Sequence, residues 1–216
     1  PRLIKDFLSL DLSMLHDPFL MKGMDIAVER IIKNIKNETP IFILGDYDVD
    51  GTSATSLLYL GIKELGGIAI PYIPNRGIDG HGISKRAIKK ATGVGADLFI
   101  TCDCGINEST IIEEGRNYGI DFIITDHHIP GENLPEAFTI LNPKQEECKY
   151  PFKELSGSGV AFKLVSALDL KLNKSNSMLE KTIEIAALGT ASDLVPLTGE
   201  NRLIVHHGFK KMKSNG

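Results

Sequence analysis

The chain of 216 residues contains no tryptophan and only three cysteines. Because three is an odd number, Cys102, Cys104 and Cys148 argue against a disulfide framework and favour the reduced thiols of a cytoplasmic protein. Cys102 and Cys104 have a Cys-x-Cys spacing that occurs in some zinc sites. No second pair of ligands follows at zinc-site spacing, so a zinc site is not favoured.

Long apolar runs are also missing. No stretch approaches the roughly 18 consecutive apolar residues of a membrane span, and no secretory signal is recognisable. We therefore expect a cytoplasmic protein that has no membrane partner. The chain begins with Pro1 rather than methionine and ends at Lys-Ser-Asn-Gly just after an expected helix, so we expect it to be a piece of a longer protein.

A surplus of basic residues is absent as well, since 24 Lys and Arg stand against 28 Asp and Glu and the net charge is −4. A protein that coats nucleic acid would need a basic surplus, so that class is disfavoured. An enzyme that acts on nucleic acid stays open, because bound cations would offset the charge of acidic metal ligands. A local basic face can also coexist with an acidic total.

What the sequence does contain is a dense group of acids after an apolar run. Asp46, Asp48 and Asp50 follow the run 41–44 at every second position, and a helical pattern over 52–65 comes next. Three acids within five residues repel one another, so a half-buried turn would not gather them without a cation to hold. The alternative is a solvated acidic turn in which an Asp caps the helix.

The same arrangement recurs twice further along the chain. Apolar runs at 97–102 and 121–125 lead into Asp103 and into Asp126-His127-His128. Successive βαβ units with right-handed crossovers place the carboxyl ends of their parallel strands at one edge of the sheet. We therefore predict an α/β fold, a parallel sheet with flanking helices, and a metal site at the carboxyl ends of the strands. Carboxylates with one or two imidazoles suit manganese or magnesium, and a bridging carboxylate suits a pair of ions.

Two segments rich in glycine and serine are candidate anion-binding loops. In 75–84 the glycines permit close backbone approach, and Arg76 and His81 offer donors for phosphate oxygens, although a structural turn is the simpler explanation. At 156–159 a Ser-Gly-Ser-Gly turn opens a helix, and the backbone amides around Ser158 could meet an anion there. Tight helix packing explains this second segment equally well.

The remaining segments indicate how the chain is divided. We expect an N-terminal arm and helix packed on the core over 1–38, a catalytic domain over 39–200, and a helix over 201–216 that leads towards a further domain. Asp193 follows an apolar helical pattern rather than a strand. Its local context alone does not mark it as a metal ligand.

Five ordered motifs resemble those of the Asp-His-His (DHH) phosphoesterase superfamily, and the likeness spans nearly the whole chain. They are Asp-Tyr-Asp-Val-Asp-Gly at 46–51, Asn-Arg with Gly-His-Gly within 75–82, Thr-Cys-Asp-Cys-Gly at 101–105, Thr-Asp-His-His at 125–128, and Gly-Thr-x-Ser-Asp-Leu-Val-Pro-Leu at 189–197. The residues within these motifs are most similar to those of the superfamily's single-strand-specific 5′-to-3′ DNA exonucleases.

The resemblance implies a binuclear metal site. Asp48 and Asp103 would hold one divalent cation, while Asp50, Asp103, His127 and Asp193 would hold the other, so that Asp103 bridges the two. Manganese is the preferred ion and magnesium the alternative. The superfamily's glycine-rich phosphate-binding domain and its oligonucleotide-binding fold would lie outside this chain.

The resemblance also implies roles for residues around the ions. Other branches of the superfamily have a histidine where Leu44 stands, so that ligand is absent and Asp46 is expected to substitute for it in part. Arg76 and His81 would clamp phosphate oxygens. His128 would orient the phosphate or protonate the leaving oxygen.

The expected activity is metal-dependent hydrolysis of phosphodiesters by a water that two metal ions activate. The favoured form is a 5′-to-3′ exonuclease for single-stranded DNA in DNA repair and recombination, with a single-strand-binding protein and a helicase as candidate partners. One alternative is a phosphodiesterase of oligonucleotides or cyclic dinucleotides from the same superfamily. Another is a catalytically silent DNA-binding scaffold, against which the intact set of acids and histidine argues.

Overall fold

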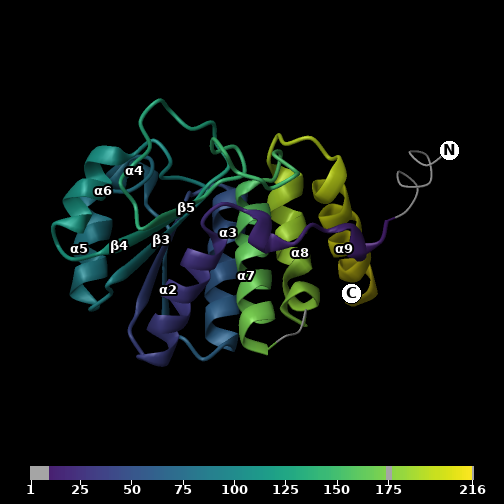
Figure 1. The fold of residues 1–216 in the computed structure, drawn as a ribbon, viewed down its shortest axis with the longest axis horizontal. Helices are drawn as coiled ribbons and strands as arrows, with labels where there is room; N and C mark the ends of the chain where they lie inside the picture. The colour runs from purple at the N-terminus through teal and green to yellow at the C-terminus, as the bar shows by residue number, and fades with distance from the viewer. Residues whose placement is uncertain (1–9, 174–176, 216) are drawn as a thin grey trace.

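A five-stranded parallel sheet in the order β2-β1-β3-β4-β5 forms the centre of the computed structural model, which describes residues 10–173 and 177–215 (Figure 1). The strands are β1 (Ile41–Gly45), β2 (Ala69–Tyr72), β3 (Leu98–Cys102), β4 (Asp121–Thr125) and β5 (Thr139–Leu141). The predicted α/β fold with a parallel sheet is confirmed. Because β1, β3 and β4 are neighbours, the three acid-bearing strand ends lie side by side.

Helices cover both faces of this sheet. They are α2 (Met24–Lys36), α3 (Val49–Glu64), α4 (Arg76–Asp79), α5 (Lys85–Gly93), α6 (Ser109–Arg116), α7 (Gly157–Asn173), α8 (Ser177–Ser192) and α9 (Gly199–Asn215), with short 3₁₀ turns η1 (Leu12–Met14) and η2 (Pro18–Leu20). Helices α5 and α6 cover one face, and α2, α3 and α7 cover the other (Figure 1). Helices α8 and α9 continue outward beyond α7. Among the described residues, no helix is both long enough and apolar enough to cross a membrane.

The strand sequences explain the two layers. Successive side chains point to opposite faces, so Ile41 and Ile43 of β1 join the core under α2, α3 and α7, while Phe42 and Leu44 join the core under α5 and α6. All four side chains are at most 2% exposed. Each such side chain contributes about 1.5–3 kcal/mol by burial, which is why near-continuous apolar runs mark strands buried on both faces.

Some boundaries differ from the prediction. The helix expected over 52–65 begins at Val49, because the Asp48 side chain accepts a hydrogen bond from the Gly51 amide at 2.8 Å and caps it there. The strand β2 lies at an edge of the sheet, where the missing amide donor of Pro71 is tolerated.

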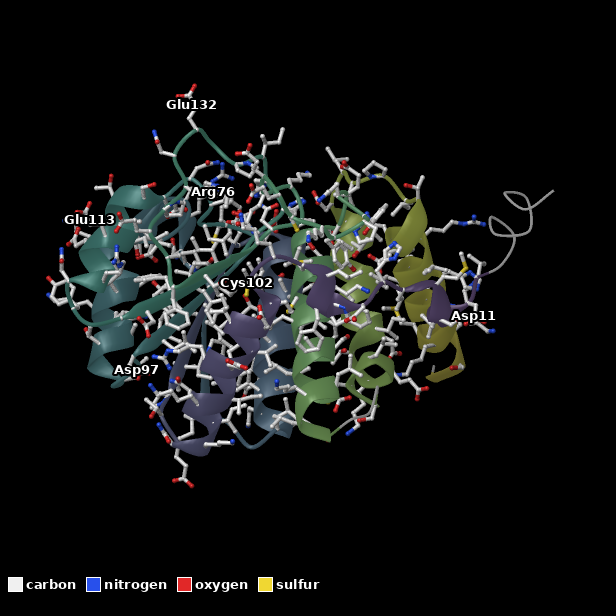
Figure 2. All side chains as sticks on the ribbon, in the orientation of Figure 1. Asp11, Arg76, Asp97, Cys102, Glu113 and Glu132 are labelled. Carbon is white, nitrogen blue, oxygen red and sulfur yellow. The ribbon has the colours of Figure 1, made fainter. Side chains whose placement is uncertain are left out.

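The strands run towards the edge where the motif loops gather. Figure 2 labels Asp97, which precedes β3, Cys102, which ends it, and Arg76, which lies on the same side as the carboxyl end of β3. The described part of the N-terminal arm, from residue 10 onward, packs on the helical layer that contains α7 and α9. His16 contacts both of these helices. The edge at the carboxyl ends is therefore left for the acids.

Candidate metal centre

The loop after β1 presents its three aspartates in different settings. Asp48 is exposed and caps α3, whereas Asp46 is 6% exposed and Asp50 is 2% exposed. Asp50 lies in the first turn of α3, and its carboxylate accepts hydrogen bonds from the amides of Gly157 at 2.6 Å and Ser158 at 2.9 Å. Burial raises the pKa of Asp50, and these hydrogen bonds oppose the rise.

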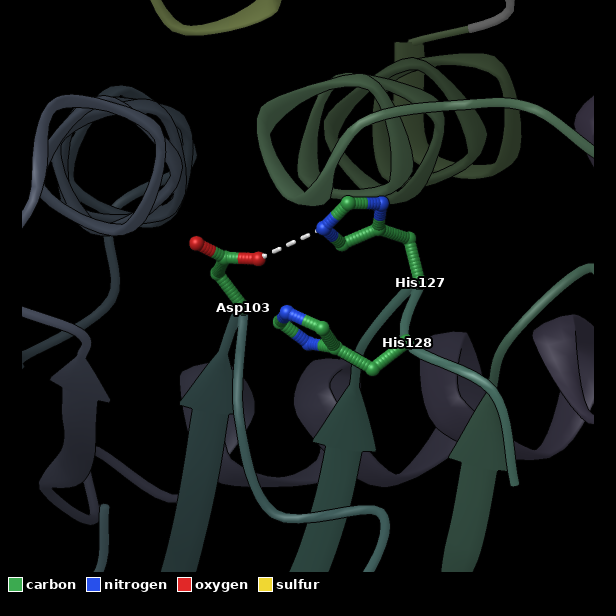
Figure 3. Close-up of side chains that lie close together, drawn as sticks. All are labelled: Asp103, His127 and His128. Carbon is green, nitrogen blue, oxygen red and sulfur yellow. Dashed lines mark ion pairs between the residues drawn. The ribbon is translucent and has the colours of Figure 1, made fainter. Parts of the chain in front are cut away.

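Asp103 follows β3 directly and lies at the centre of the group. Its backbone has φ of 62°, a left-handed conformation that is uncommon for a residue with a side chain. The side chain is 3% exposed, and burial raises the pKa of its carboxyl to about 7. Figure 3 shows Asp103 and His127 pointing toward each other above the strand ends.

Three carboxylates surround a single imidazole nitrogen. The distance from His127 Nε2 is 3.0 Å to Asp103 Oδ1, 3.5 Å to Asp193 Oδ2 and 4.0 Å to Asp50 Oδ2. Within the described chain, Asp103 Oδ1 and Asp193 Oδ2 are buried and accept no hydrogen bond. Burial lowers the pKa of His127, but the Asp103 and Asp50 carboxylates outweigh it, so the net shift is upward.

Asp193 reaches this group from a distant part of the sequence. It comes directly after the end of α8, and its amide donates to the carbonyl of Gly189 at 3.1 Å. Helix α8 packs against α3, which contains Asp50, and against α7, whose first amides donate to the Asp50 carboxylate. Packing of helices, rather than the end of a strand, therefore brings Asp193 to the site, and its local sequence gives no such signal.

His128 has a different environment from His127. Its Nδ1 lies 2.7 Å from Asp126 Oδ1, and this interaction raises the pKa of His128 to about 9. Asp126 is fully buried and also accepts the amides of Ile106, His127 and His128. Asp126 therefore fixes the loop after β4, a role that the sequence analysis did not assign, although its place in the Asp-His-His run was a signal.

Ligand atoms of these residues form three overlapping groups, each within 4.8 Å: Asp46 with Asp48 and Asp103, Asp50 with His127 and Asp193, and Asp103 with His127 and His128. Asp103 belongs to two of the groups and contacts the third through His127. Carboxylate oxygens with one imidazole are the ligands that Mn²⁺ and Mg²⁺ take in proteins. The buried oxygens without partners and this donor set fit divalent cations.

The residues predicted to clamp phosphate divide into two cases. Arg76 and His81 are exposed at the same edge, and His81 Nδ1 lies 3.5 Å from Asp46 Oδ1. Ser158 is fully buried, and its amide holds the Asp50 carboxylate. The N-terminus of α7 thus meets an anion that is a side chain of the protein, and the phosphate contact of Ser158 stays a prediction.

A cavity of about 310 Å³ opens beside the acids. It is lined by the loop after β3, from Asp103 to Glu108, together with His81, Asp126 and His128. The cavity therefore has one candidate metal ligand, Asp103, and one candidate phosphate-binding residue, His81, in its lining. A substrate that binds there would contact both.

A parallel sheet with carboxylates and a histidine at the carboxyl ends of adjacent strands defines an α/β protein with a carboxylate-histidine metal site. The chain belongs to the DHH family: the model of the DHH family, N-terminal domain, matches residues 40–190. The resemblance inferred from the five motifs is confirmed.

The relatives compared below are both described as the single-stranded-DNA-specific exonuclease RecJ. The chain is 42% identical over 198 residues to the single-stranded-DNA-specific exonuclease RecJ of Bacillus subtilis, covering 92% of this chain and 24% of that protein. It is 37% identical over 204 residues to RecJ of Escherichia coli, covering 90% and 35%. The chain thus spans about a quarter to a third of the length of these curated relatives.

Solved structures agree with the fold. A crystal structure of exonuclease RecJ bound to manganese superposes with a TM-score of 0.83 at 32% identity, over 94% of this chain and 50% of that one. RecJ from Thermus thermophilus in complex with Mn²⁺ superposes with a TM-score of 0.76 at 30% identity, over 90% and 28%. These relatives bind the metal that the donor set here favours.

Proposed function

We propose that this chain is the catalytic part of a 5′-to-3′ exonuclease for single-stranded DNA that uses two divalent cations, with Mn²⁺ preferred and Mg²⁺ as the alternative. The observation that carries the proposal is the convergence of three carboxylates on His127 Nε2 at the carboxyl ends of adjacent strands. The names of the relatives support the substrate class.

The ligand assignment follows the groups of donor atoms. Asp48 and Asp103 would hold one cation, with Asp46 close enough to assist, and Asp50, Asp103, His127 and Asp193 would hold the other. The short distances from Asp103 to His127, and from His127 to Asp193, support a bridging place for Asp103. The backbone amides that bind the Asp50 carboxylate keep it oriented towards His127.

The bound cations supply charge neutralisation and an acidified water for attack on phosphorus. The residues of the chain bind the phosphate and supply the proton for the leaving oxygen. Arg76 and His81 bind non-bridging phosphate oxygens, because both offer N–H donors: His81 lines the cavity, and the exposed Arg76 contacts the same Tyr47 ring as His81. His128, kept protonated by Asp126, orients the phosphate or donates a proton to the leaving oxygen.

The domain division and the cellular setting belong to the same proposal. The catalytic domain covers 39–200, the arm and α2 before it support the core, and the segment 201–216 leads towards a phosphate-binding domain. The whole protein works in the cytoplasm in DNA repair and recombination, with a single-strand-binding protein and a helicase as partners.

Hydrolysis of a single-stranded DNA with a 5′ label by this chain tests the proposal, with Mn²⁺, with chelator, and beside a dinucleotide. Asp103→Asn is the inactive control, and Glu113→Gln on the outer side of α6 is the matched acid that should change nothing. Release of 5′ mononucleotides that chelator abolishes is expected. Cleavage of the dinucleotide alone would favour the oligonucleotide phosphodiesterase, and absence of Mn²⁺ binding in calorimetry would favour the silent scaffold.

A further inference from the structure

Tyr47 lies between two of the candidate metal ligands but offers the site neither a carboxylate nor an imidazole. Its amide donates to Asp46 Oδ1 at 2.7 Å, and the next residue, Asp48, caps α3. The backbone on both sides of Tyr47 is therefore fixed. Its side chain, which is partly exposed, extends from the loop 46–48, which we call the metal loop.

The Tyr47 ring contacts both residues of the candidate phosphate clamp. The Arg76 guanidinium carbon lies 4.9 Å from the ring centroid, within the range of a cation-π contact. The His81 ring centroid lies 6.1 Å away at an interplanar angle of 68°, which is an edge-on arrangement. One aromatic ring thus joins two side chains that are five residues apart on another loop.

The backbone of that other loop is held by separate contacts. Asp79 accepts hydrogen bonds from the Tyr72 hydroxyl at 2.9 Å and the Asn75 amide at 2.8 Å, and Glu108 accepts one from the Ile83 amide at 2.7 Å. These contacts fix where the loop begins and ends, but they do not fix the side chains of Arg76 and His81. Both of those side chains are exposed, and the imidazole is 69% exposed.

An exposed arginine samples many rotamers, and each binding event must select one of them. A ring that already holds the guanidinium reduces this loss, and it does so next to the aspartates that hold the cations. The metal loop follows β1, and the loop 75–84 that carries Arg76 and His81 follows β2. The Tyr47 ring joins the two loops beside the contact of His81 Nδ1 with Asp46 Oδ1 at 3.5 Å, and it adds Arg76, which that contact does not reach.

We propose that Tyr47 is a positioning residue that sets Arg76 and His81 at a fixed spacing from the metal centre, so that a phosphate held by the ions meets the clamp. This assignment rests on the proposed function of the site. Tyr47 acts through the face and the edge of its ring rather than through its hydroxyl, so Phe is a conservative replacement.

The experiment compares Tyr47→Leu and Tyr47→Phe by steady-state kinetics on a dinucleotide and a long single strand. Tyr47→Leu should raise KM three- to tenfold with kcat within twofold and with unchanged Mn²⁺ affinity in calorimetry. Tyr47→Phe should restore the wild-type KM. Tyr59→Leu is the matched control, because Tyr59 also packs a cation, Lys63 at 5.3 Å, but lies on α3 away from the clamp.

A double-variant cycle separates positioning from other roles. In an Arg76→Ala/His81→Ala background, Tyr47→Leu should have no further effect on KM. The same three- to tenfold rise in that background would overturn the proposal, since the ring would then act on substrate directly, for example by stacking with a base. A loss of Mn²⁺ affinity in Tyr47→Leu would also overturn it, since the ring would then support the ligands.

NMR provides a measurement that needs no turnover. The Tyr47 ring current should shift the Arg76 side-chain protons upfield in the wild type and in Tyr47→Phe, and the shift should disappear in Tyr47→Leu. If the wild type cleaves no phosphodiester, the proposed function fails while this shift still tests the contact. If the shift persists in Tyr47→Leu, the positioning role fails even in an active enzyme.

Discussion

Asp103 shows how a single residue can be arranged for binding at the expense of stability. It combines a left-handed backbone, a buried carboxyl whose pKa is about 7, and an oxygen that accepts no hydrogen bond from any described residue. Each feature costs free energy in a protein without metal, and strained backbone of this kind gathers at functional sites. A bound cation would supply this oxygen with a ligand bond in addition to its ion pair with His127 at 3.0 Å.

The first prediction concerns Asp103→Asn. The unfolded carboxyl has a pKa of 3.8, so at neutral pH the folded state holds a charge that burial disfavours. Removing that charge should stabilise the chelator-treated protein by at most about 4 kcal/mol, since the raised pKa already includes the favourable interaction of Asp103 with His127. Scanning fluorimetry in chelator should show a rise in Tm of up to roughly 8–16 °C, at about 2–4 °C per kcal/mol for a chain of this size.

The same variant should lose the stabilisation that Mn²⁺ gives to the wild type. Glu113→Gln, which changes an exposed acid, is the control and should behave as the wild type in both conditions. A Tm in chelator that falls with Asp103→Asn would contradict the inference that this carboxylate is poorly solvated in the folded protein.

The second prediction concerns pH. Metal ligation needs Asp103 deprotonated and His127 neutral, and both groups have a raised pKa, so proton loss must accompany binding. The apparent Mn²⁺ affinity should therefore rise by about tenfold between pH 6 and pH 8 from Asp103 alone. Calorimetry in two buffers of different ionisation enthalpy should detect the released protons at pH 6.5, and an affinity independent of pH would contradict this.

At the residue scale, the sequence predicted some ligands for physical reasons and others only by resemblance. Asp50, Asp103 and His127 follow apolar runs whose ends a parallel sheet must bring together. Asp193 follows a helix, and only the packing of α8 against α3 and α7 takes it to the site. Ser158 was placed correctly at a helix N-terminus near an anion, but which anion a helix meets depends on tertiary packing.

At the scale of elements, the N-terminus of α7 supports the metal centre. Two of its amides hold the Asp50 carboxylate, and the positive end of the helix dipole favours that charge. The sequence predicted β1, β3 and β4 well because both faces of these strands are buried, so each apolar run has nearly the length of its strand. Start points of helices were less predictable, because a side-chain cap such as Asp48 can begin α3 earlier than its apolar pattern.

The third prediction tests how closely α7 approaches the site. A Cβ at Gly157 would lie 2.6 Å from the Asp103 side chain, closer than real Cβ contacts allow. Gly157→Ala should therefore displace Asp103 or the start of α7 and weaken Mn²⁺ binding by at least tenfold, about 1.4 kcal/mol. Gly93→Ala in α5, where a Cβ would meet nothing within 4 Å, is the matched control.

Calorimetry with Mn²⁺ measures the effect, and thermal unfolding in chelator reports the accompanying strain. If Gly157→Ala bound Mn²⁺ as tightly as the wild type, Asp103 could not be a ligand at its present position. If Gly93→Ala were affected equally, the loss would reflect helix substitution in general.

At the scale of the whole molecule, a buried ionic cluster joins the N-terminal arm to the helical layer. Lys163 of α7 and Glu200 of α9 are each 2% exposed, and their Nζ and Oε1 atoms lie 2.5 Å apart. Glu200 also accepts the Tyr150 hydroxyl at 2.6 Å and the His16 amide at 2.9 Å, and Lys163 donates to the His16 carbonyl at 2.9 Å. Segments from the start, middle and end of the chain meet in this cluster, so no local sequence pattern predicts it.

The fourth prediction is that breaking the cluster is costly mainly because it leaves one buried charge without its partner. Burial lowers the pKa of Lys163 while Glu200 opposes that shift, so the ammonium depends on its partner. Glu200→Ala should destabilise the fold by about 3–5 kcal/mol, whereas Lys163→Met/Glu200→Leu, which removes both charges, should recover most of that loss. Glu29→Ala, which breaks the exposed pair with Lys171, is the control and should cost less than about 1 kcal/mol.

Urea unfolding measures the stability of all three variants, and hydrogen exchange at the His16 amide reports on the arm. Because that amide donates to Glu200, its exchange should accelerate in Glu200→Ala before global unfolding. A double variant as unstable as Glu200→Ala would mean that the hydrogen bonds to Tyr150 and His16, rather than the charge pair, hold the arm in place.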